Sequence, residues 1–281
     1  MRTDLAKESK TLFRHLNGIA EETVRKDDIE ITRIDVLTEQ AAQKLDKPVG
    51  RYVTIASDQI SFMDREERKR LSGALCEELV QMTHNPENVI VIGLGNRYIA
   101  ADALGTKTAE YIYVTRHIHM HMKDVLPAHT PVVSSFCANV LGVTGIETVE
   151  VVSALVSELK PQLVILIDSL AASRTEHLGC VIQCNNSGIA PGAGVGNFRG
   201  MLSESTLGVP VIAVGVPLVI DAETILHESG CCKPSSAHPF DLIVTPKDID
   251  AIVKDVSRVL SDAINRMLFG DNYSEIERLL K

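Results

Sequence analysis

The sequence predicts an α/β fold with a mostly parallel, twisted sheet and helices on both of its faces. Three features indicate this. From residue 88 onward, apolar runs typical of buried strands alternate with segments of helical periodicity, as in parallel sheets that are covered by helices. The 281 residues are enough to bury a sizeable core. The chain also lacks internal repeats and low-complexity segments, so we expect one continuous unit.

The earlier part of the chain is less regular. Residues 7–24 carry a helical spacing of apolar side chains, and residues 31–37 have a β-like pattern. A strand is predicted at 51–57. An amphipathic helix is predicted at 65–83, with Asp64 as its N-cap.

The later elements follow one another in a regular order. We expect residues 1–50 to form an N-terminal extension and residues 51–281 to form the α/β domain. The elements predicted in the second part are strand 88–93, a helix from about 102, strand 131–136, helix 147–160, strands 163–167, 180–184 and 209–215, and helix 248–269.

Composition and charge exclude several classes of protein. With 45% hydrophobic and 23% charged residues, the chain is typical of a globular protein. No stretch approaches the roughly 20 apolar residues that a membrane helix needs, and MRTDLAKESK (1–10) lacks the apolar centre of a secretory signal. The net charge of −9 argues against direct contact with nucleic acid, since phosphates require clustered Lys and Arg. We therefore expect a cytoplasmic protein with no direct nucleic-acid partner and no membrane partner.

The cysteine pattern fits a reducing compartment. The six cysteines show no CxxC spacing, and in the cytosol such residues are usually small buried hydrophobes. We expect free thiols and no zinc site at Cys76, Cys137, Cys180, Cys184, Cys231 and Cys232.

Two aspartates stand just beyond apolar runs that predict buried strands. Asp102 follows NVIVIGLGN (88–96), and Asp168 ends LVILID (163–168). Because the carboxyl ends of the strands in an open α/β sheet meet at one edge, acids from two connections can share a site there. Acid–base hydrolysis needs a general acid and a general base, and a pair of carboxyl groups can supply both. The sequence therefore predicts a catalytic pair.

Each acid also has a purely structural interpretation. An aspartate after a strand often caps the next helix, which Asp102 could do for ALGTKTAEYI (103–112). Asp168 could close a turn by accepting hydrogen bonds from its own backbone. Asp221 follows a third apolar run, and helix capping of AETILHES (222–229) explains it without any chemistry.

Two glycine-containing segments are candidates for contact with a substrate or an oxyanion. GLGN (93–96) predicts a tight turn, and NNSGIAPGAGVGN (185–197) can bring backbone amides close to a ligand. The first also resembles part of a dinucleotide-binding fingerprint, but Tyr98 stands where the third glycine would fall. The candidate residues are Gly93, Gly95, Asn96, Gly192, Gly194 and Gly196.

The run RHIHMHMKD (116–124) holds three histidines that alternate with apolar residues. In a strand, His117, His119 and His121 would share one face at a spacing that can hold a transition metal. The same alternation also describes a half-exposed strand without any metal. We expect no metal and no other cofactor.

Five ordered motifs carry a family resemblance. Together they resemble the germination proteases of spore-forming bacteria over about residues 28–265. The first motif is also similar to that of the hydrogenase-maturation endopeptidases, whose acid at the position of Asp102 binds metal, so the resemblance implies a similar fold. The motifs are GLGNRYIAADALG (93–105), VTGIET (143–148), LIDSLAASR (166–174), SGIAPGAGVGN (187–197) and STLGVPVIAVGVPLVIDAETI (205–225).

The resemblance implies an atypical aspartic endopeptidase that degrades small acid-soluble proteins of the spore during germination. By motif, its two functional aspartates fall on Asp102 and Asp168. It further implies a homo-oligomer, a tetramer in relatives, that is located in the forespore and spore core. It also implies a zymogen that cuts itself after an acid and before an apolar residue and Ala. TDLA (3–6) matches such a site, with Asp4 and Leu5 flanking the bond. A cut there removes residues 1–4, which is shorter than the usual prosegment of the family.

The chain also departs from the pattern of the family. Asn186, Ala190 and Ala193 stand where relatives tend to carry Asp, His and Ser, and Ala101 stands where they often have Pro. The order of Ser173 and Arg174 is swapped. These changes leave specificity and activity open.

Three function classes follow. In the first, two nearby carboxylates share one proton, so that one polarises the carbonyl group while the other deprotonates water. The second is a metal-dependent peptidase closer to the hydrogenase-maturation enzymes. The third is a catalytically weakened relative that acts as a spore binding or assembly protein. Metal analysis separates the first two, and peptide hydrolysis separates either of them from the third.

Overall fold

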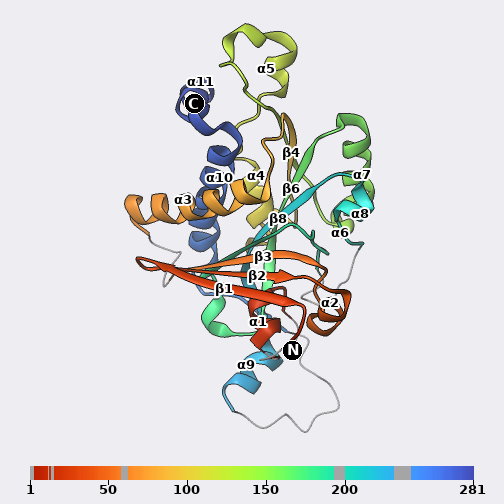
Figure 1. The fold of residues 1–281 in the computed structure, drawn as a ribbon, viewed down its shortest axis with the longest axis vertical. Coiled ribbons are helices and arrows are strands. Elements are labelled where there is room, and N and C mark those ends of the chain that lie inside the picture. Colours follow the sequence, from red (N-terminus) through yellow and green to blue (C-terminus); the bar gives the residue numbers. More distant parts are fainter. Residues whose placement is uncertain (1–2, 12, 14–15, 58–62, 193–199, 231–241) are drawn as a thin grey trace.

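The structure is a computed structural model. It describes residues 3–11, 13, 16–57, 63–192, 200–230 and 242–281. Strands and helices alternate through most of the chain, and the elements lie as Figure 1 shows. The strands are β1 Ile19–Lys26, β2 Ile29–Val36, β3 Gly50–Ser57, β4 Asn88–Gly93, β5 Val132–Cys137, β6 Leu163–Ala172, β7 Val181–Asn185, β8 Val211–Asp221 and β9 Ile243–Val244.

The helices vary widely in length. Short 3₁₀ helices lie between some of them, and one of these, η1 (Ala100–Asp102), contains a candidate catalytic residue. The α-helices are α1 Ala6–Thr11, α2 Glu39–Leu45, α3 Arg65–Met82, α4 Leu104–Ala109, α5 Arg116–His121, α6 Leu141–Thr144, α7 Thr148–Leu159, α8 Glu204–Leu207, α9 Ala222–Glu228, α10 Ile249–Phe269 and α11 Tyr273–Leu280.

Within the described residues, nine strands form one mixed sheet. Its main path is β1-β2-β3-β7-β8-β6-β4-β5, and β9 pairs with the end of β8. The four strands β8, β6, β4 and β5 are parallel to one another, which confirms the predicted parallel core. β1, β2, β3 and β7 are joined in antiparallel pairs, and β7 meets β8 antiparallel. The α/β fold is therefore confirmed, with an antiparallel extension built by the N-terminal strands.

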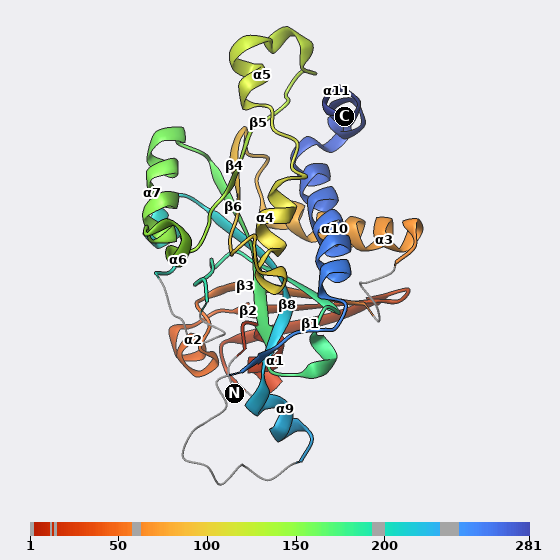
Figure 2. The same ribbon diagram turned by 180° about the vertical axis from the view of Figure 1, so that it is seen from behind.

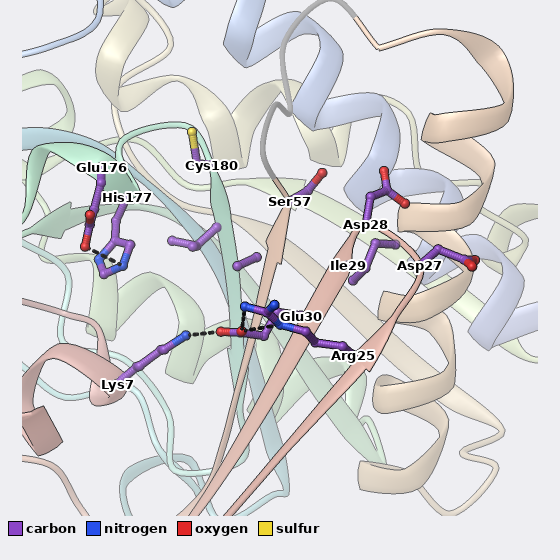
Figure 3. A pocket seen from close by; sticks show the side chains of 12 residues that line it. Lys7, Arg25, Asp27, Asp28, Ile29, Glu30, Ser57, Glu176, His177 and Cys180 are labelled. Carbon is purple, nitrogen blue, oxygen red and sulfur yellow. Dashed lines mark hydrogen bonds and ion pairs between the residues drawn. The ribbon is translucent and has the colours of Figure 1, made fainter.

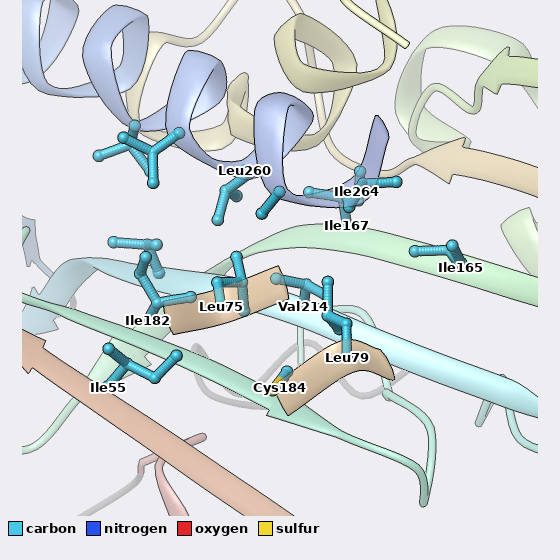
Figure 4. Packing of buried hydrophobic residues seen from close by; sticks show 14 of the residues in the cluster. Ile55, Leu75, Leu79, Ile165, Ile167, Ile182, Cys184, Val214, Leu260 and Ile264 are labelled. Carbon is cyan, nitrogen blue, oxygen red and sulfur yellow. The ribbon is translucent and has the colours of Figure 1, made fainter. Parts of the chain in front are cut away.

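Helices cover both faces of the parallel strands. α3 and α10 pack on one face, and α7 and α8 pack on the other. Figure 2 shows the same arrangement from behind. In the larger core, Leu75 and Leu79 of α3 and Leu260 of α10 meet Ile167 of β6 and Ile182 of β7 (Figure 4). Burial of apolar surface stabilises the folded chain by about 25 cal/mol per Å². These contacts therefore hold in place the strands whose ends carry the candidate site.

The antiparallel strands are less enclosed. β2 and β3 are largely buried, whereas β1 is an exposed edge strand with charged residues along it. Charges on an edge discourage pairing with another chain. The helices α1 and α2 pack near β2 and β3 in a small core of their own. The division into an extension, 1–50, and a domain, 51–281, stays a prediction.

Two local predictions were wrong. Residues 7–24 do not form one helix, because α1 ends at Thr11 and β1 begins at Ile19 after a turn at Gly18, which has φ +88°. The histidine run forms the short helix α5 instead of a strand. Only Ile118 of that helix is buried, so the alternation does not create a histidine face on a sheet.

Two predicted caps are confirmed. Asp64 accepts hydrogen bonds from the first turn of α3 and forms a capping box with Glu67. Asp221 caps α9 by accepting from the amide of Glu223. Among the described helices, none has the length and apolar character needed to cross a bilayer.

Candidate active site

The candidate site lies where the parallel strands β4 and β6 end. β4 ends at Gly93, and the next amide, of Leu94, still donates to the carbonyl oxygen of Ile167 at 2.8 Å. Asp168 follows Ile167 in β6 and lies opposite Gly215 of β8. The chain that leaves β4 therefore passes directly beside Asp168.

Asp102 is held by the turn that follows β4. The Asn96 amide donates to Oδ2 of Asp102 at 2.8 Å. Gly95 has φ +89°, and a Cβ atom there would lie 2.1 Å from the carbonyl oxygen of Asp102 and 2.8 Å from its Oδ1. Only glycine fits this close approach. The GLGN turn therefore positions an acid, and the Asn96 amide is already engaged by it.

Two further glycines bring α4 against the sheet. A Cβ on Gly93 would lie 2.1 Å from the carbonyl oxygen of Gly105, and a Cβ on Gly105 would lie 2.1 Å from that of Ile167. Because each of these glycines has a hydrogen atom in place of a Cβ, the start of α4 can contact both β4 and β6. Since η1 leads directly into α4, this contact fixes how far Asp102 lies from the strand ends.

Asp102 and Asp168 line the same cleft, which has a volume of about 560 Å³. The predicted convergence of the two strand ends on one site is therefore seen in the structure. The hydroxyl group of Ser169 is buried beside them and has no hydrogen-bond partner in the described part of the chain. Other residues that line the cleft include Asp4, Asn96, Ala101, Thr148, Leu170, Ala171, Ile189, Ala190 and Gly192.

The two acids have different environments. Burial raises the pKa of Asp168 well above its ordinary value, and the negative charge of Asp102 raises it further, although the hydrogen bond from the Ser169 amide at 2.9 Å opposes both. Burial also raises the pKa of Asp102, but the hydrogen bond from the Asn96 amide opposes this. Asp168 is 5% exposed, whereas Asp102 is only partly buried. The pair therefore favours a proton on Asp168 and a negative charge on Asp102.

One residue of the N-terminal segment, Asp4, lines this cleft. The amide of Asp4 donates to the Ala171 carbonyl oxygen at 3.0 Å, and the Ala171 amide donates to Oδ2 of Asp4 at 2.8 Å. Leu5 is fully buried, and Lys47 donates to the carbonyl oxygen of Thr3 at 2.9 Å. Burial raises the pKa of Asp4, against the effect of the Ala171 amide. The acid that precedes the expected cut bond therefore lies in the same cleft as the candidate catalytic pair.

A second anchor holds α1. The side chain of Glu8 accepts from the amide of Ser173 at 2.7 Å, from its hydroxyl at 2.8 Å and from Thr3, and it pairs with Nδ1 of His177 at 2.6 Å. Burial alone would raise the pKa of Glu8, but the hydrogen bonds from His177, Thr3 and Ser173 together hold it below its ordinary value. Figure 3 shows His177 beside Glu176, and Lys7 of α1 paired with Glu30 at 2.6 Å. The segment is thus fixed on both sides of Leu5.

A family model described as "Germination protease" matches residues 1–230 of the chain. The chain belongs to the germination protease family. It is therefore a peptidase. It is 37% identical to the germination protease of Clostridium perfringens strain 13, an alignment that covers 94% of each chain. It is also 37% identical to that of Caldanaerobacter subterraneus subsp. tengcongensis, with 100% of this chain and 98% of the relative covered.

The chain is also similar to one further relative and to one solved structure. The germination protease of Bacillus subtilis strain 168 is 37% identical over 82% of this chain and 66% of its own length. Among solved structures, the [NiFe] hydrogenase maturation protease HycI from Thermococcus kodakarensis aligns with a TM-score of 0.38 at 15% identity. That alignment covers 66% of this chain and 98% of HycI.

The residues expected to depart from the family pattern fall at different places. Ala101 and Ala190 line the cleft. Asn186 instead accepts from the Arg51 amide at 2.8 Å, where β3 begins. Ser173 has a clear contact with Glu8, whereas Arg174 points to solvent and pairs with Glu176. Ala193, Gly194 and Gly196 lie outside the described residues.

No three His, Cys, Asp or Glu side chains in the described ranges are grouped so that they could hold a metal ion. His117, His119 and His121 lie on α5, at the opposite end of the molecule from α1 (Figure 1). The described cysteines, Cys76, Cys137, Cys180 and Cys184, form no disulfide.

Sequence reasoning missed several residues of the site. Gln183, Glu8 and Lys47 contact the N-terminal segment from positions far away in the chain. One signal was available, since Gln183 interrupts an otherwise apolar strand, CVIQC (180–184). A glutamine that is 3% exposed needs hydrogen-bond partners. Its partners are Asp4 and Ala6.

Proposed function

We propose that this germination protease begins the degradation of small acid-soluble proteins in the spore core, and that it is made as a zymogen that cuts itself between Asp4 and Leu5. Asp102 and Asp168 would activate the water molecule. The observation that carries the proposal is the joint presence, in one cleft, of two carboxyl groups of unequal pKa and a peptide segment that matches the expected cleavage site.

The assignment of roles follows from the environments of the two acids. Each acid accepts a hydrogen bond from one backbone amide, Asp102 from that of Asn96 and Asp168 from that of Ser169, so the difference between them is burial. Asp102 is less buried, which favours its ionised form, so it serves as the base. Asp168 is more deeply buried and is repelled by the charge of Asp102, so it holds the shared proton.

The hydrolytic step uses these two states. Asp102 takes a proton from water as the water oxygen forms a bond to the carbonyl carbon of Asp4. Asp168 donates its proton toward the carbonyl oxygen and so stabilises the tetrahedral intermediate. When the C–N bond to Leu5 breaks, the proton held by Asp102 passes to the leaving amine. As the carbonyl group re-forms, a hydroxyl proton of the intermediate returns to Asp168, so both acids regain their starting states and water is the only other reactant.

The docked segment supports self-processing. Asp4 is held from both sides, by Ala171 of β6 and by Gln183 of β7. The chain bends at Asp4 and enters α1 at Ala6, and contacts to its backbone on both sides of Leu5 hold it as they would hold a substrate. By the same reasoning, separate substrates would present an acid and an apolar residue on either side of the cut bond.

Two proposals rest on the family resemblance. The enzyme would act as a homotetramer, which sedimentation of the purified protein at working concentration tests. It would need no metal. Hydrolysis that persists in the presence of a chelator supports this proposal, whereas hydrolysis that stops with the chelator and returns with added metal contradicts it.

The decisive experiment uses the full chain and a purified small acid-soluble spore protein. Mass spectrometry then identifies the fragments of the substrate and the N-terminus of the protease itself. We expect cuts after acidic residues and the loss of residues 1–4. An intact substrate and an intact N-terminus, under both acidic and neutral conditions, would contradict the proposal.

A further inference from the structure

The side chain of Gln183 spans the bond between Asp4 and Leu5. Its Nε2 donates to the Asp4 carbonyl oxygen at 2.9 Å, and its Oε1 accepts from the Ala6 amide at 2.7 Å. The two bonds fix the orientation of the amide group, because reversing it would set a donor against the Ala6 N–H. One side chain therefore contacts the backbone on both sides of Leu5.

This contact pattern is that of a parallel β-ladder. In such a ladder, one residue donates to the carbonyl group before its neighbour and accepts from the amide after it. The amide group of Gln183 does the same around Leu5, and the opposite side of the segment pairs with Ala171. Because the contacts of Gln183 are to the backbone alone, they are available to any peptide whose backbone follows the same path, with a bend at Asp4 and a helical turn from Ala6.

A second cavity adjoins the cleft. It has a volume of about 710 Å³, is lined by Gln183 and Asn185, and shares Asp4, Leu170 and Ile189 with the first. Asp4 thus borders both cavities, and its carbonyl oxygen meets Gln183 on the side of the second. A peptide longer than the N-terminal segment has room in this second cavity.

We propose that Gln183 is both the backbone clamp and an oxyanion donor of this peptidase: it holds the substrate backbone on both sides of the residue that follows the cut bond, and its Nε2 stabilises the negative charge that develops on the carbonyl oxygen. This inference rests on the proposed function, because it takes Asp4–Leu5 as the bond to be cut. A donor that already lies 2.9 Å from the carbonyl oxygen is placed as preorganised oxyanion donors are.

The first test measures binding without chemistry. In an Asp102→Asn chain, which keeps the N-terminal segment intact, hydrogen exchange of the Ala6 amide is followed with and without Gln183→Met. Methionine keeps the volume of the side chain but removes both hydrogen bonds, so exchange should become about tenfold faster. The control is Thr54→Val, because Thr54 lies opposite Gln183 in β3 and its hydroxyl has no partner among the described residues. It should leave the exchange rate unchanged.

The second test measures hydrolysis of the peptide TDLAKES by the chain with Asp102 intact. We expect Gln183→Met to lower kcat about hundredfold, as loss of one oxyanion donor does, and Thr54→Val to retain activity. Replacing the alanine of TDLAKES by N-methylalanine removes the amide hydrogen that Gln183 would accept. The unmodified chain should cut this peptide about tenfold more slowly than TDLAKES, whereas Gln183→Met should cut both peptides at the same rate. Gln183→Glu keeps an acceptor for the Ala6 amide but loses the donor to the Asp4 carbonyl oxygen. The Ala6 amide should therefore stay protected from hydrogen exchange, while kcat should fall.

The outcomes separate the two proposals. Unchanged exchange and an unchanged rate in a folded Gln183→Met chain overturn the inference. Faster exchange in Gln183→Met, together with no hydrolysis by any chain, supports the clamp but contradicts the proposed peptidase chemistry. Slow hydrolysis with unchanged exchange contradicts the clamp.

Discussion

The two halves of the sheet supply different parts of the candidate site. The parallel strands β4 and β6 are covered by helices on both faces, and they fix the two acids at their ends. The antiparallel strand β7 joins the exposed N-terminal strands to this core and carries Gln183. In the proposed mechanism, the chemistry therefore comes from the helix-covered half, and recognition of the peptide backbone comes from the junction with the other half.

Under the proposed function, this division between the two halves of the sheet explains how one cleft would process its own chain. The N-terminal segment lies across the junction, with Ala171 of β6 on one side and Gln183 of β7 on the other. Since none of the hydrogen bonds among the described residues joins the segment to Asp102 or Asp168, we expect substitutions of the acids to leave the segment in place, and substitutions that loosen the segment to leave the acids in place. Variants of each half should therefore have separable effects.

The largest effect is expected for the acids. Asp102→Asn or Asp168→Asn removes the base or the proton donor, so peptide hydrolysis should fall at least about a thousandfold. Exchange protection of the N-terminal segment should remain. Asp221→Asn is the matched control, since asparagine also caps a helix. Full hydrolysis by either of the first two variants would falsify the carboxylate pair.

Gly95→Ala should have the next largest effect. The added Cβ would collide with the backbone of Asp102, and displacing a catalytic group by about 1 Å can lower the rate roughly hundredfold. Gly208→Ala isolates the backbone strain, because Gly208 also has a positive φ, +69°, but open space around it. Thermal unfolding and kcat are measured for both variants. Equal losses of activity would mean that strain alone explains the effect.

The pH profile should reflect the unequal pair. Activity should rise with pH as Asp102 ionises and fall again as Asp168 loses its proton, by about tenfold per pH unit on each limb. Because burial and the charge of Asp102 raise the pKa of Asp168 well above its ordinary value, the falling limb belongs to Asp168. The profile of kcat/KM for TDLAKES measures this. A kcat/KM that keeps rising with pH would mean that the required proton is not on Asp168.

A smaller effect is expected for the anchor of α1. Glu8→Gln removes the charge that Ser173 and His177 contact, so self-cleavage should slow severalfold while hydrolysis of added TDLAKES is maintained. Glu176→Gln is the control, because it changes an exposed carboxylate beside the same histidine. The N-terminus is followed by mass spectrometry over time.

The same anchor predicts a pH dependence of docking. The pKa of Glu8 lies below its ordinary value of 4.5 in the folded chain. The stabilisation from Glu8 is therefore fully present above that pH, and it is lost as the pH falls through the lowered pKa. Amide exchange across α1 should increase on acidification, and Glu8→Gln should not show this increase.

Much of the parallel half could be predicted from the sequence, because local patterns decide it. The apolar runs ending near Gly93 and Asp168 identified two strands whose ends meet, and Asp64 and Asp221 were recognised as caps from their neighbours alone. The catalytic roles of Asp102 and Asp168 stay predictions, since strand ends fix their place and not their chemistry.

The rest depends on contacts between distant residues. Gln183 meets Ala6 across 177 positions, and Glu8 meets Ser173 across 165, so no local pattern records either contact. Residues 19–26 also fit a helical spacing, but pairing with β2 along their whole length overrides it. The six residues of α5 are too short for a period of two to be told from a helix.

The anchored N-terminal segment also has a kinetic consequence. A peptide tethered beside its binding site has an effective concentration on the order of millimolar. A separate substrate of equal affinity at micromolar concentration would then occupy the cleft only about one thousandth of the time. Activity toward other chains should therefore begin after a lag, and the length of this lag should be set by how fast the tethered segment leaves rather than by how much substrate is added.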